Sequence, residues 1–258
     1  MTPKTALITG ASSGIGYELA KLFATDKYDL ILVSRDQENL QRVQAELQEK
    51  HQVKIKILAV DLTLNNAPRE TFAFCEKENI TLDVLVNDAG FGLVGLFRDL
   101  DEQKQLNMID LNVRALTQLT KLFLAQATQG AKILNVASLA AFQPGPLMAV
   151  YYATKAYVLS FSEALAEELK DREISVTALC PGPVATNFWR VAHPNRGEEK
   201  IGQIIDEWPA NRVALVGYEG MKRGKRIVIP GAMNKIMAFL NRLLPRSLVT
   251  RVVMRVNR

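Results

Sequence analysis

The chain has 258 residues, of which 48% are hydrophobic and 23% charged, and its 32 Lys and Arg against 27 Asp and Glu give a formal net charge of +5. This size and composition predict one α/β domain with a sizeable buried core. The two cysteines and two histidines stand isolated in the sequence, which argues against a disulfide framework, a metal site and a Ser-His-Asp triad.

The first residues and the length of the apolar runs bear on where the protein is expected to lie. The first residues, MTPKTALITG, enter a strand-like segment at once, without the apolar stretch and cleavage site of a signal peptide. No apolar run reaches the length that crosses a bilayer. We therefore expect a cytoplasmic protein.

Short runs rich in β-branched residues and Leu recur along the chain, separated by longer amphipathic segments. This alternation is typical of a doubly wound parallel sheet with helices on both faces. After the second run, residues 36–50 have the pattern of a polar-faced helix, and its stripe of Leu40, Val43 and Leu47 predicts core packing. The predicted strands span 5–9, 29–34, 54–61, 82–87, 131–138, 174–180 and 226–230.

A glycine-rich turn, TGASSGIG, follows the first predicted strand and opens a helix. Gly10, Gly14 and Gly16 allow a tight bend and close approach of a pyrophosphate, whose charge is met by amides at the helix N-terminus. The spacing is GxxxGxG and not the GxGxxG of the longer dehydrogenases, but the flanking strand and helix are the context that such a cradle requires. The turn predicts a dinucleotide-binding site.

The stretch VYYATKAYV, residues 150–158, places two tyrosines and a lysine within about one turn of a predicted helix. Side chains four apart share a face, so Tyr151 and Lys155 point the same way and Tyr152 does not. An ammonium lowers the pKa of a nearby phenol from its ordinary value of about 10, which makes Tyr151 a candidate acid/base group. The same spacing also occurs as a plain surface contact, so the pair gains its meaning from the other motifs.

Five motifs resemble, in order and spacing, the classical short-chain dehydrogenase/reductase (SDR) family: TGASSGIG, VNDAG, the serine of NVAS, YYATK and CPGPVATNF. The resemblance covers residues 4–190. It implies a single Rossmann-like domain with strand order 3-2-1-4-5-6-7. It also implies an oxidoreductase that transfers a hydride between NAD(P)(H) and a carbonyl or secondary alcohol.

The resemblance also implies the role of each site residue. Tyr151 corresponds to the acid/base, and Lys155 to the partner that lowers the tyrosine pKa and holds the nicotinamide ribose. Ser138 corresponds to the serine that polarises the substrate oxygen, and Asn112 to the asparagine that holds a proton-relay water. The implied cofactor-binding residues are Gly10, Ser12, Ser13, Gly14, Ile15, Gly16, Arg35, Asp61, Asn87, Ala89, Gly90, Tyr151, Lys155, Pro181, Gly182, Val184 and Thr186.

The end of the second strand bears on the choice of nicotinamide. Arg35 stands where an NAD enzyme offers a carboxylate to the ribose 2′-hydroxyl, and an arginine suits a 2′-phosphate instead, which favours NADP(H). Asp36 keeps NAD(H) open, and Arg35 could also be a solvated residue of the turn. Asp61 resembles the residue that contacts the adenine ring, and Thr186 the one that bonds the carboxamide or pyrophosphate.

Two features depart from the family pattern. The motif NNAG reads NDAG here, with Asp88 in its second position, so we expect altered local hydrogen bonding and lower stability, with catalysis retained. The helix between Asn112 and the fifth strand looks short. Helices of this region commonly form the family's interface, so the expected homodimer or homotetramer is less secure.

The substrate is the least determined part of the prediction. Aromatic and apolar residues in segments bordering the pocket suggest an apolar carbonyl or alcohol, although they could equally be core packing. The alternatives are a catalytically weak NADP-binding or sensing protein of the same fold, and a related enzyme for epimerisation or dehydration. The suggested pocket residues are Phe91, Leu93, Phe142, Phe188, Trp189 and Trp208.

The last part of the chain differs in charge and pattern. We expect a catalytic domain over 1–230, with a substrate segment at 187–218 that includes a helix ending near Val216, and a basic amphipathic extension over 231–258. Ten Lys or Arg and no acidic residue follow Glu219. The extension suits packing on the domain, on a second subunit or on a membrane surface, and nucleic acid is disfavoured because aromatic residues are not interleaved with the basic ones. Its apolar stripe comprises Ile236, Phe239, Leu240, Leu243 and Leu244, followed by Leu248, Val249, Val252, Val253 and Val256.

Overall fold

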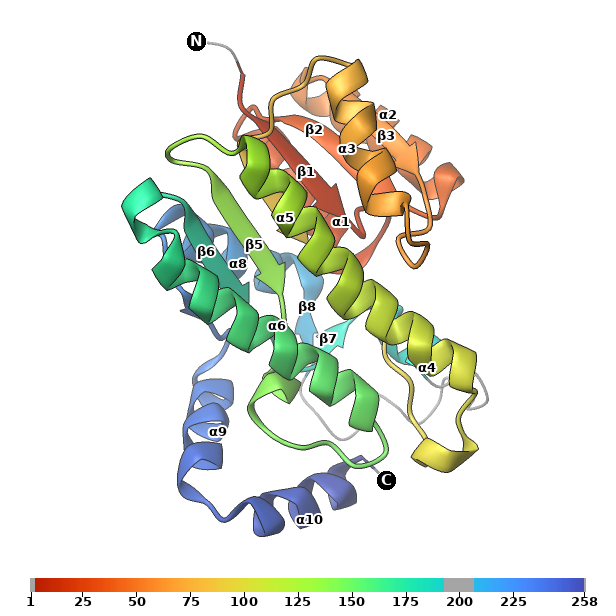
Figure 1. The fold of residues 1–258 in the computed structure, drawn as a ribbon, viewed down its shortest axis with the longest axis vertical. Helices are drawn as coiled ribbons and strands as arrows, with labels where there is room; N and C mark the ends of the chain where they lie inside the picture. Colours follow the sequence, from red (N-terminus) through yellow and green to blue (C-terminus); the bar gives the residue numbers. More distant parts are fainter. Residues whose placement is uncertain (1–2, 193–206, 258) are drawn as a thin grey trace.

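A computed structural model describes residues 3–192 and 207–257, and the middle of the predicted substrate segment, including His193, lies outside these residues (Figure 1). The described residues form a parallel seven-stranded sheet with the order β3-β2-β1-β4-β5-β6-β9. This confirms the predicted order, because β9 is the seventh predicted strand. The strands are β1 Thr5–Thr9, β2 Asp29–Ser34, β3 Ile55–Ala59, β4 Val84–Asn87, β5 Lys132–Val136, β6 Ser175–Leu179 and β9 Ile227–Val228.

Helices cover both faces of the sheet, as its strands require. Along β1, Ala6 and Ile8 belong to one core cluster and Leu7 to another, because alternate side chains of a strand point to opposite faces. The first cluster includes side chains of α1, α2 and α8, and the second includes side chains of α3, α5 and α6. The helices are α1 Gly14–Thr25, α2 Gln37–His51, α3 Ala67–Lys77, α4 Glu102–Ile109, α5 Leu116–Gln126, α6 Ala149–Glu168, α7 Phe188–Ala192, α8 Ala210–Lys222, α9 Ala232–Leu243 and α10 Arg246–Val256.

The parallel sheet brings the motifs together at one edge. The carboxyl ends of parallel strands meet on the same side, so the segments after β1, β4, β5 and β6 converge. A small second sheet lies beside them, in which β7 (Val184–Ala185) pairs with β8 (Trp208–Pro209). Each of these strands has only two residues, so no periodicity marks them in the sequence.

Two helices differ from the prediction in length. The helix expected to end near Val216 is α8, which continues to Lys222 because Gly217 and Gly220 serve helix packing and do not break the helix. A Cβ at Gly217 would lie 2.6 Å from Leu179, and one at Gly220 would lie 2.3 Å from a Val228 methyl, so only glycine lets α8 approach the sheet this closely. The helix after Asn112 is α5, and it continues α4 through a π-helical stretch over Asp110–Ala115.

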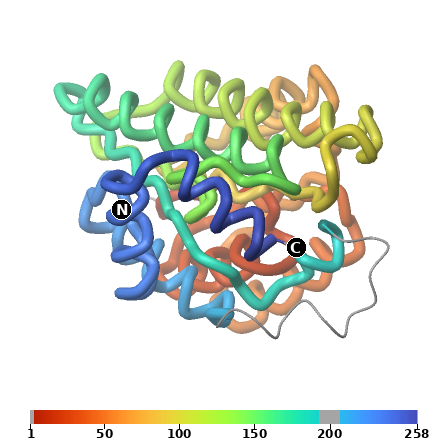
Figure 2. The backbone as a smooth tube through the Cα atoms, turned by 90° about the horizontal axis from the view of Figure 1, so that it is seen from below, coloured from red at the N-terminus to blue at the C-terminus, as the bar shows by residue number. Residues whose placement is uncertain are grey.

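After β9 the chain leaves the sheet and forms α9 and α10, which cross below its carboxyl edge (Figures 1 and 2). α10 packs through Val249 and Val253, which are buried. The predicted stripe on α9 is exposed instead of packed on the domain's own core, with Phe239 at 60%. Among the described residues no helix is long and apolar enough to cross a membrane.

Candidate active site

The glycine-rich turn lies between β1 and α1, at the edge where the motifs converge. Gly10 has φ of 70° and Gly14 has φ of 58°, a left-handed backbone that favours glycine. A Cβ at Gly16 would lie 2.5 Å from the carbonyl oxygen of Gly10, so a larger residue would not fit there. The N-terminus of α1 faces the resulting hollow, and such termini attract anions.

Asp88 lies directly beneath the glycine turn. Its backbone N–H donates to the Thr9 hydroxyl at 3.1 Å, and its carboxyl accepts the Gly16 N–H. Burial raises the pKa of Asp88 from 3.8 to about 7, against the opposing effects of the Lys155 charge and the Gly16 amide. The predicted change in local hydrogen bonding therefore takes the form of a carboxyl group bound to the cradle itself.

Tyr151 and Lys155 lie one turn apart on α6 and face the same hollow. The Lys155 ammonium is 5.9 Å from the centre of the Tyr151 ring and donates to the carbonyl of Val136 at 2.7 Å. Burial lowers the pKa of Lys155 to about 8, while the charge on Asp88 acts in the opposite direction. Lys155 is 6% exposed, and the nearby Asp88 carboxylate favours its charged form.

Ser138 follows β5 and caps a short 3-10 helix over Leu139–Phe142, where its hydroxyl accepts the Ala140 N–H at 3.1 Å. It also hydrogen-bonds Tyr151. Burial raises the pKa of Tyr151 above its ordinary value of 10, and the Ser138 hydrogen bond opposes this only in part. This differs from the expectation that Lys155 sets a lowered tyrosine pKa, because burial outweighs the other effects on this phenol.

Asn112 lies in the π-helical stretch between α4 and α5, where the helix widens. Its amide N–H groups donate to the Phe91 carbonyl at 3.0 Å and the Thr154 hydroxyl at 3.1 Å, and its oxygen accepts the Phe91 N–H at 3.2 Å. A Cβ at Gly90 would lie 2.9 Å from that oxygen. Asn112 thus ties the segment after β4 to α6, from a buried position behind the hollow.

Arg35 and Asp61 face each other at the other end of the hollow, with a side-chain N–O separation of 3.9 Å. Arg35 is largely exposed. Asp36 lies nearby, but it caps α2 by accepting the Asn39 backbone N–H at 3.0 Å and the Asn39 side-chain N–H at 2.6 Å. Asp36, whose carboxylate left NAD(H) as a possible cofactor, is therefore engaged in the cap of α2.

The segment after β6 closes the hollow from the opposite side. The Pro181 carbonyl accepts the Leu139 N–H at 2.7 Å, which fixes this segment against the Ser138 turn. A Cβ at Gly14 would lie 3.3 Å from a Thr186 methyl, so the glycine turn and this segment nearly meet. The Phe188 ring lies 5.2 Å from the Tyr151 ring, centre to centre.

Together these segments enclose a cavity of about 460 Å³. Gly16, Asn87 and Asn112 lie behind its lining, although they were predicted as site residues. Asn87 is buried between β4, β5 and α5, where its N–H groups donate to Asn135 and Thr120. The predicted residues that line the cavity are Gly10, Ser12, Ser13, Gly14, Ile15, Arg35, Asp61, Ala89, Gly90, Ser138, Tyr151, Lys155, Pro181, Gly182, Val184 and Thr186.

The suggested substrate-pocket residues divide into two groups. Phe91, Phe188 and Trp189 line the cavity. Leu93 lines a neighbouring pocket, and Phe142 packs against a core cluster that includes Val158 and Leu159 of α6. The Arg212 guanidinium lies over the Trp208 ring, 4.1 Å from its centre. Three of the six suggested residues therefore border the main cavity, and the other three lie elsewhere.

The tail supplies lining residues that the sequence analysis did not assign to the site. Asn234, Met237, Val256 and Asn257 all border the cavity. Tyr152 does so too, but it hydrogen-bonds Asn257 and packs its ring on Gly145, away from Lys155. No motif marks these tail residues, since only the path of α9 and α10 brings them to the sheet edge.

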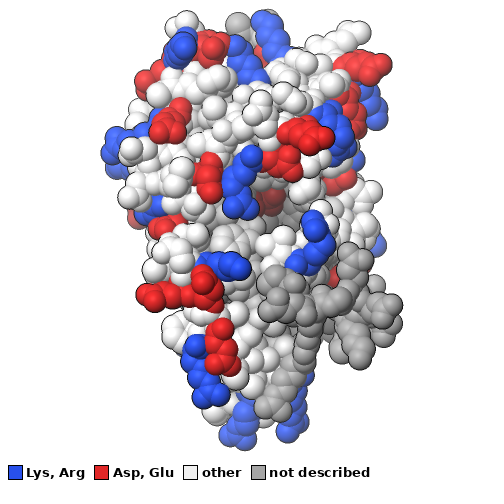
Figure 3. All heavy atoms as spheres, turned by 90° about the vertical axis from the view of Figure 1, so that its right-hand side faces the viewer, with Lys and Arg blue, Asp and Glu red and all other residues white. Residues whose placement is uncertain are grey.

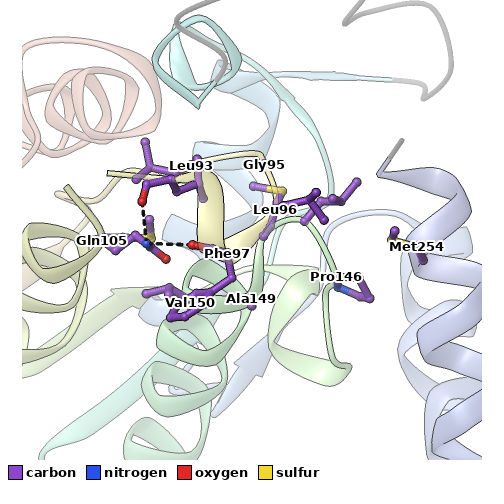
Figure 4. A pocket seen from close by; sticks show the side chains of 13 residues that line it. Leu93, Gly95, Leu96, Phe97, Gln105, Pro146, Ala149, Val150 and Met254 are labelled. Carbon is purple, nitrogen blue, oxygen red and sulfur yellow. Dashed lines mark hydrogen bonds between the residues drawn. The ribbon is translucent and has the colours of Figure 1, made fainter. Parts of the chain in front are cut away.

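A second, mainly apolar pocket of about 200 Å³ adjoins the cavity, and Met148 lines both. Figure 4 shows Met254 of α10 on one side of it and Gln105 of α4 on the other. The Gln105 N–H groups donate to the carbonyls of Phe97 at 3.3 Å and Leu100 at 3.2 Å. Within 3–192 and 207–257, no group of three or more His, Cys, Asp or Glu side chains could hold a metal ion.

The fold and the site are those of a dinucleotide-binding α/β oxidoreductase. A family model described as short chain dehydrogenase matches residues 4–197. The chain belongs to this family, as its motifs predicted.

Three similar proteins illustrate the family. The very-long-chain 3-oxoacyl-CoA reductase of Rattus norvegicus is 29% identical over 98% of this chain and 79% of that protein. A short-chain dehydrogenase from Sphingobium yanoikuyae in complex with NADPH has a TM-score of 0.80 and 30% identity, covering 89% of this chain and 88% of that one. The bulky-bulky ketone specific alcohol dehydrogenase from Comamonas testosteroni has a TM-score of 0.79 and 28% identity, covering 94% and 92%.

Proposed function

We propose that this protein is an NADP(H)-dependent oxidoreductase that interconverts an apolar carbonyl compound and its secondary alcohol. The observation that carries the proposal is the meeting of Ser138, Tyr151 and Lys155 in the same cavity as the glycine turn. A dinucleotide cradle and a proton donor serve the two halves of carbonyl reduction, because the reaction needs a hydride at carbon and a proton at oxygen.

Tyr151 is the proposed proton donor in the reducing direction. Burial raises its pKa, so the phenol keeps its proton at neutral pH and can transfer it to an oxygen that gains negative charge. Ser138, which is within hydrogen-bond reach of Tyr151, polarises the same substrate oxygen. Asn112 is a proposed positioning residue that ties the Phe91 backbone to Thr154 on α6, and the family resemblance adds a relay water next to it.

The cavity fits a dinucleotide. Gly10 and Gly14 of the glycine turn line it with a left-handed backbone and no side chain, and the N-terminus of α1 faces it. When bound, the nicotinamide supplies the hydride. Lys155 is the proposed ligand of the nicotinamide ribose, and Pro181, Gly182, Val184 and Thr186, which line the cavity, would border the nicotinamide.

The surroundings of the second strand support NADP(H) over NAD(H). Arg35 lines the cavity with an exposed guanidinium, which suits a 2′-phosphate. Asp36, the carboxylate that would suit a 2′-hydroxyl, is engaged in the cap of α2. Asp61 remains the proposed contact of the adenine end, opposite Arg35. The Sphingobium yanoikuyae relative was solved with NADPH, which agrees with this assignment.

An apolar substrate is proposed from the walls of the cavity. Phe91, Phe188 and Trp189 border it, and Met148 connects it to the second, apolar pocket. The names of two relatives, a very-long-chain 3-oxoacyl-CoA reductase and a bulky-bulky ketone specific alcohol dehydrogenase, point to large carbonyl substrates in this part of the family. The alternative, a sensing protein without turnover, is not favoured because binding alone requires no buried tyrosine beside a serine and a lysine.

The domain limits and partners also remain proposals. We retain a catalytic domain over 1–230 with an extension over 231–258, which agrees with the departure of α9 and α10 from the sheet after β9. A homodimer or homotetramer is retained from the family resemblance. Contact with a membrane surface is also proposed for the extension.

The test is a screen of NADPH oxidation against aldehydes, ketones and 3-oxoacyl esters of increasing chain length, with NADH in parallel. The expected result is turnover of apolar ketones or 3-oxoacyl esters with NADPH at higher kcat/KM than with NADH. Binding of NADPH without turnover across the whole panel would instead support the sensing alternative.

A further inference from the structure

The helix α9 presents its large apolar side chains to the outside. The positions that face the protein are small or polar: Ala238 is buried, Asn234 donates to the Pro230 carbonyl at 2.7 Å, and Asn241 donates to Gln143. An ordinary surface helix has the opposite arrangement, with apolar residues toward the core and polar residues outward. Packing on this domain therefore leaves the apolar side of α9 uncovered.

The exposed apolar residues of α9, α10 and their link form one set, here called the tail face. Of the 18 large hydrophobic side chains that are exposed in the described part of the chain, ten belong to it. Their exposed fractions run from 42% to 66%, and such a concentration on a short segment marks an interaction surface. The tail face comprises Met233, Ile236, Met237, Phe239, Leu240, Leu243, Leu244, Leu248, Val252 and Val256.

Exposed basic residues are interspersed along the helices that carry the tail face. Between 231 and 257 the chain has five basic residues and no acidic residue, and all five are exposed. Without the ten Lys and Arg that follow Glu219, the chain holds 22 basic against 27 acidic residues, so positive charge is concentrated at this end. Figure 3 shows Lys and Arg side chains among uncharged ones at the lower tip, where the tail lies. The five basic residues are Lys235, Arg242, Arg246, Arg251 and Arg255.

Exposed apolar side chains together with basic ones favour an anionic lipid surface as partner over a second copy of this chain. Two copies that joined through their tail faces would bring two basic rows together, and like charges in close contact repel. An anionic lipid surface offers the complement of both properties, because the apolar side chains enter the interface and the basic ones meet the headgroups.

The tail face also reaches the active site. Met237 and Val256 belong to the tail face and line the main cavity, and Met254 lines the apolar pocket beside it. Asn257 holds this end of the tail in place by donating to the Pro146 carbonyl at 2.9 Å. A surface that touches the tail face therefore lies next to the mouth of the cavity.

We propose that the tail face docks on an anionic lipid surface and that the apolar carbonyl substrate passes from that surface into the cavity. The second part of this inference rests on the proposed function. The docking itself depends only on the tail face and its basic residues.

Docking is tested by flotation of the full chain with vesicles of phosphatidylglycerol and of phosphatidylcholine, at low and high salt. The expected result is binding to the anionic vesicles at low salt only. The double variant Arg242→Glu/Arg246→Glu should weaken it on the order of 30-fold or more, because each basic residue near the surface contributes about 1 kcal/mol. Phe239→Ser/Leu243→Ser should also abolish flotation. Lys50→Glu/Lys77→Glu, with the same charge change at the ends of α2 and α3, is the matched control and should leave flotation nearly unchanged.

Three results would overturn the docking. They are full retention in the unbound fraction with anionic vesicles at low salt, equal binding to neutral vesicles, and a dimer in light scattering that Phe239→Ser/Leu243→Ser converts to a monomer. The last would identify the tail face as a subunit interface. Circular dichroism and NADPH binding verify that each variant is folded.

Substrate delivery is tested with a long-chain ketone embedded in the anionic vesicles and a short, water-soluble ketone. Phe239→Ser/Leu243→Ser is expected to lower the rate with the embedded ketone at least tenfold and to leave the rate with the soluble ketone unchanged. If the variant handles both ketones as the wild type does, delivery from the lipid is contradicted. If vesicles bind but neither ketone is reduced, the docking stands and the proposed function fails.

Discussion

The sheet domain and the tail use the same kinds of hydrophobic residue in opposite ways. In the sheet domain Phe123 of α5 is fully buried between sheet and helices, whereas Phe239 of α9 is 60% exposed. Burying a phenylalanine stabilises a fold, and keeping one exposed contributes little to stability. The difference indicates that the hydrophobic residues of the sheet domain serve folding, and that the exposed ones of the tail are available for the proposed docking.

Of the two adjacent tyrosines of α6, one contacts the sheet domain and the other contacts the tail. Tyr151 contacts Ser138 at the sheet edge, and Tyr152 contacts Asn257 of the tail. We expect Tyr151→Phe to lower kcat about 10²- to 10⁴-fold with NADPH affinity nearly intact, since it removes a proton transfer. Tyr152→Phe, the matched control, should change kcat less than about tenfold. Steady-state kinetics and NADPH titration measure both, and equal damage by the two substitutions would refute the assignment.

A pair of phenylalanine substitutions tests the same contrast in stability. Phe123→Ala should lower the free energy of unfolding by about 3 to 5 kcal/mol, because it leaves a cavity in the core. Phe239→Ala should change it by less than about 0.5 kcal/mol. Urea unfolding of the two variants measures the difference. A large loss with Phe239→Ala would show that the tail is part of the folding core.

A charge substitution at Arg35 tests the predicted preference for NADPH over NADH. Arg35→Asp should shift the ratio of kcat/KM for NADPH over NADH by about 10- to 100-fold toward NADH, because it removes a charge-assisted contact and adds a repulsion. Arg98→Asp makes the same charge change at an exposed position and should leave the ratio unchanged. A wild-type protein that already uses NADH as well as NADPH would contradict the proposal.

The last substitution concerns Asp88 and the pH dependence of stability. Its pKa is raised from 3.8 to about 7 in the folded protein, so the folded state loses stability as pH rises from about 4 to about 7, with the loss complete above that. Asp88→Asn removes this loss. The variant should therefore gain more stability relative to wild type at pH 8 than at pH 5, by on the order of 1 to 3 kcal/mol. Equal differences at the two pH values in urea unfolding would contradict it.

The sequence was sufficient for the parts of the molecule that depend on local pattern. All seven strands, the glycine turn and the Tyr151–Lys155 face could be predicted, since each follows from residue spacing. The extension of α8 past Gly217 could not, because those glycines are explained by contacts with distant strands. The raised pKa of Tyr151 depends on burial that arises only after folding.

For the tail, too, the sequence pattern predicts the helices but not how they pack on the domain. Its pattern predicted amphipathic helices, and both α9 and α10 are present. The pattern gave no means to tell which face would be covered, because that depends on where the helices lie on the domain. Asn257 at the cavity and Phe239 in solvent are both consequences of that path.

In the proposed reaction, the cavity at the sheet edge reduces a carbonyl with Tyr151 as proton donor. The most direct measurement is single-turnover transfer of deuterium from nicotinamide-deuterated NADPH to an apolar ketone, followed by mass spectrometry of the alcohol. We expect deuterium on the carbinol carbon with wild type and Tyr152→Phe, and a rate about 10²- to 10⁴-fold lower with Tyr151→Phe. Transfer at the wild-type rate by Tyr151→Phe, or NADPH bound without any transfer by the wild type, would contradict it.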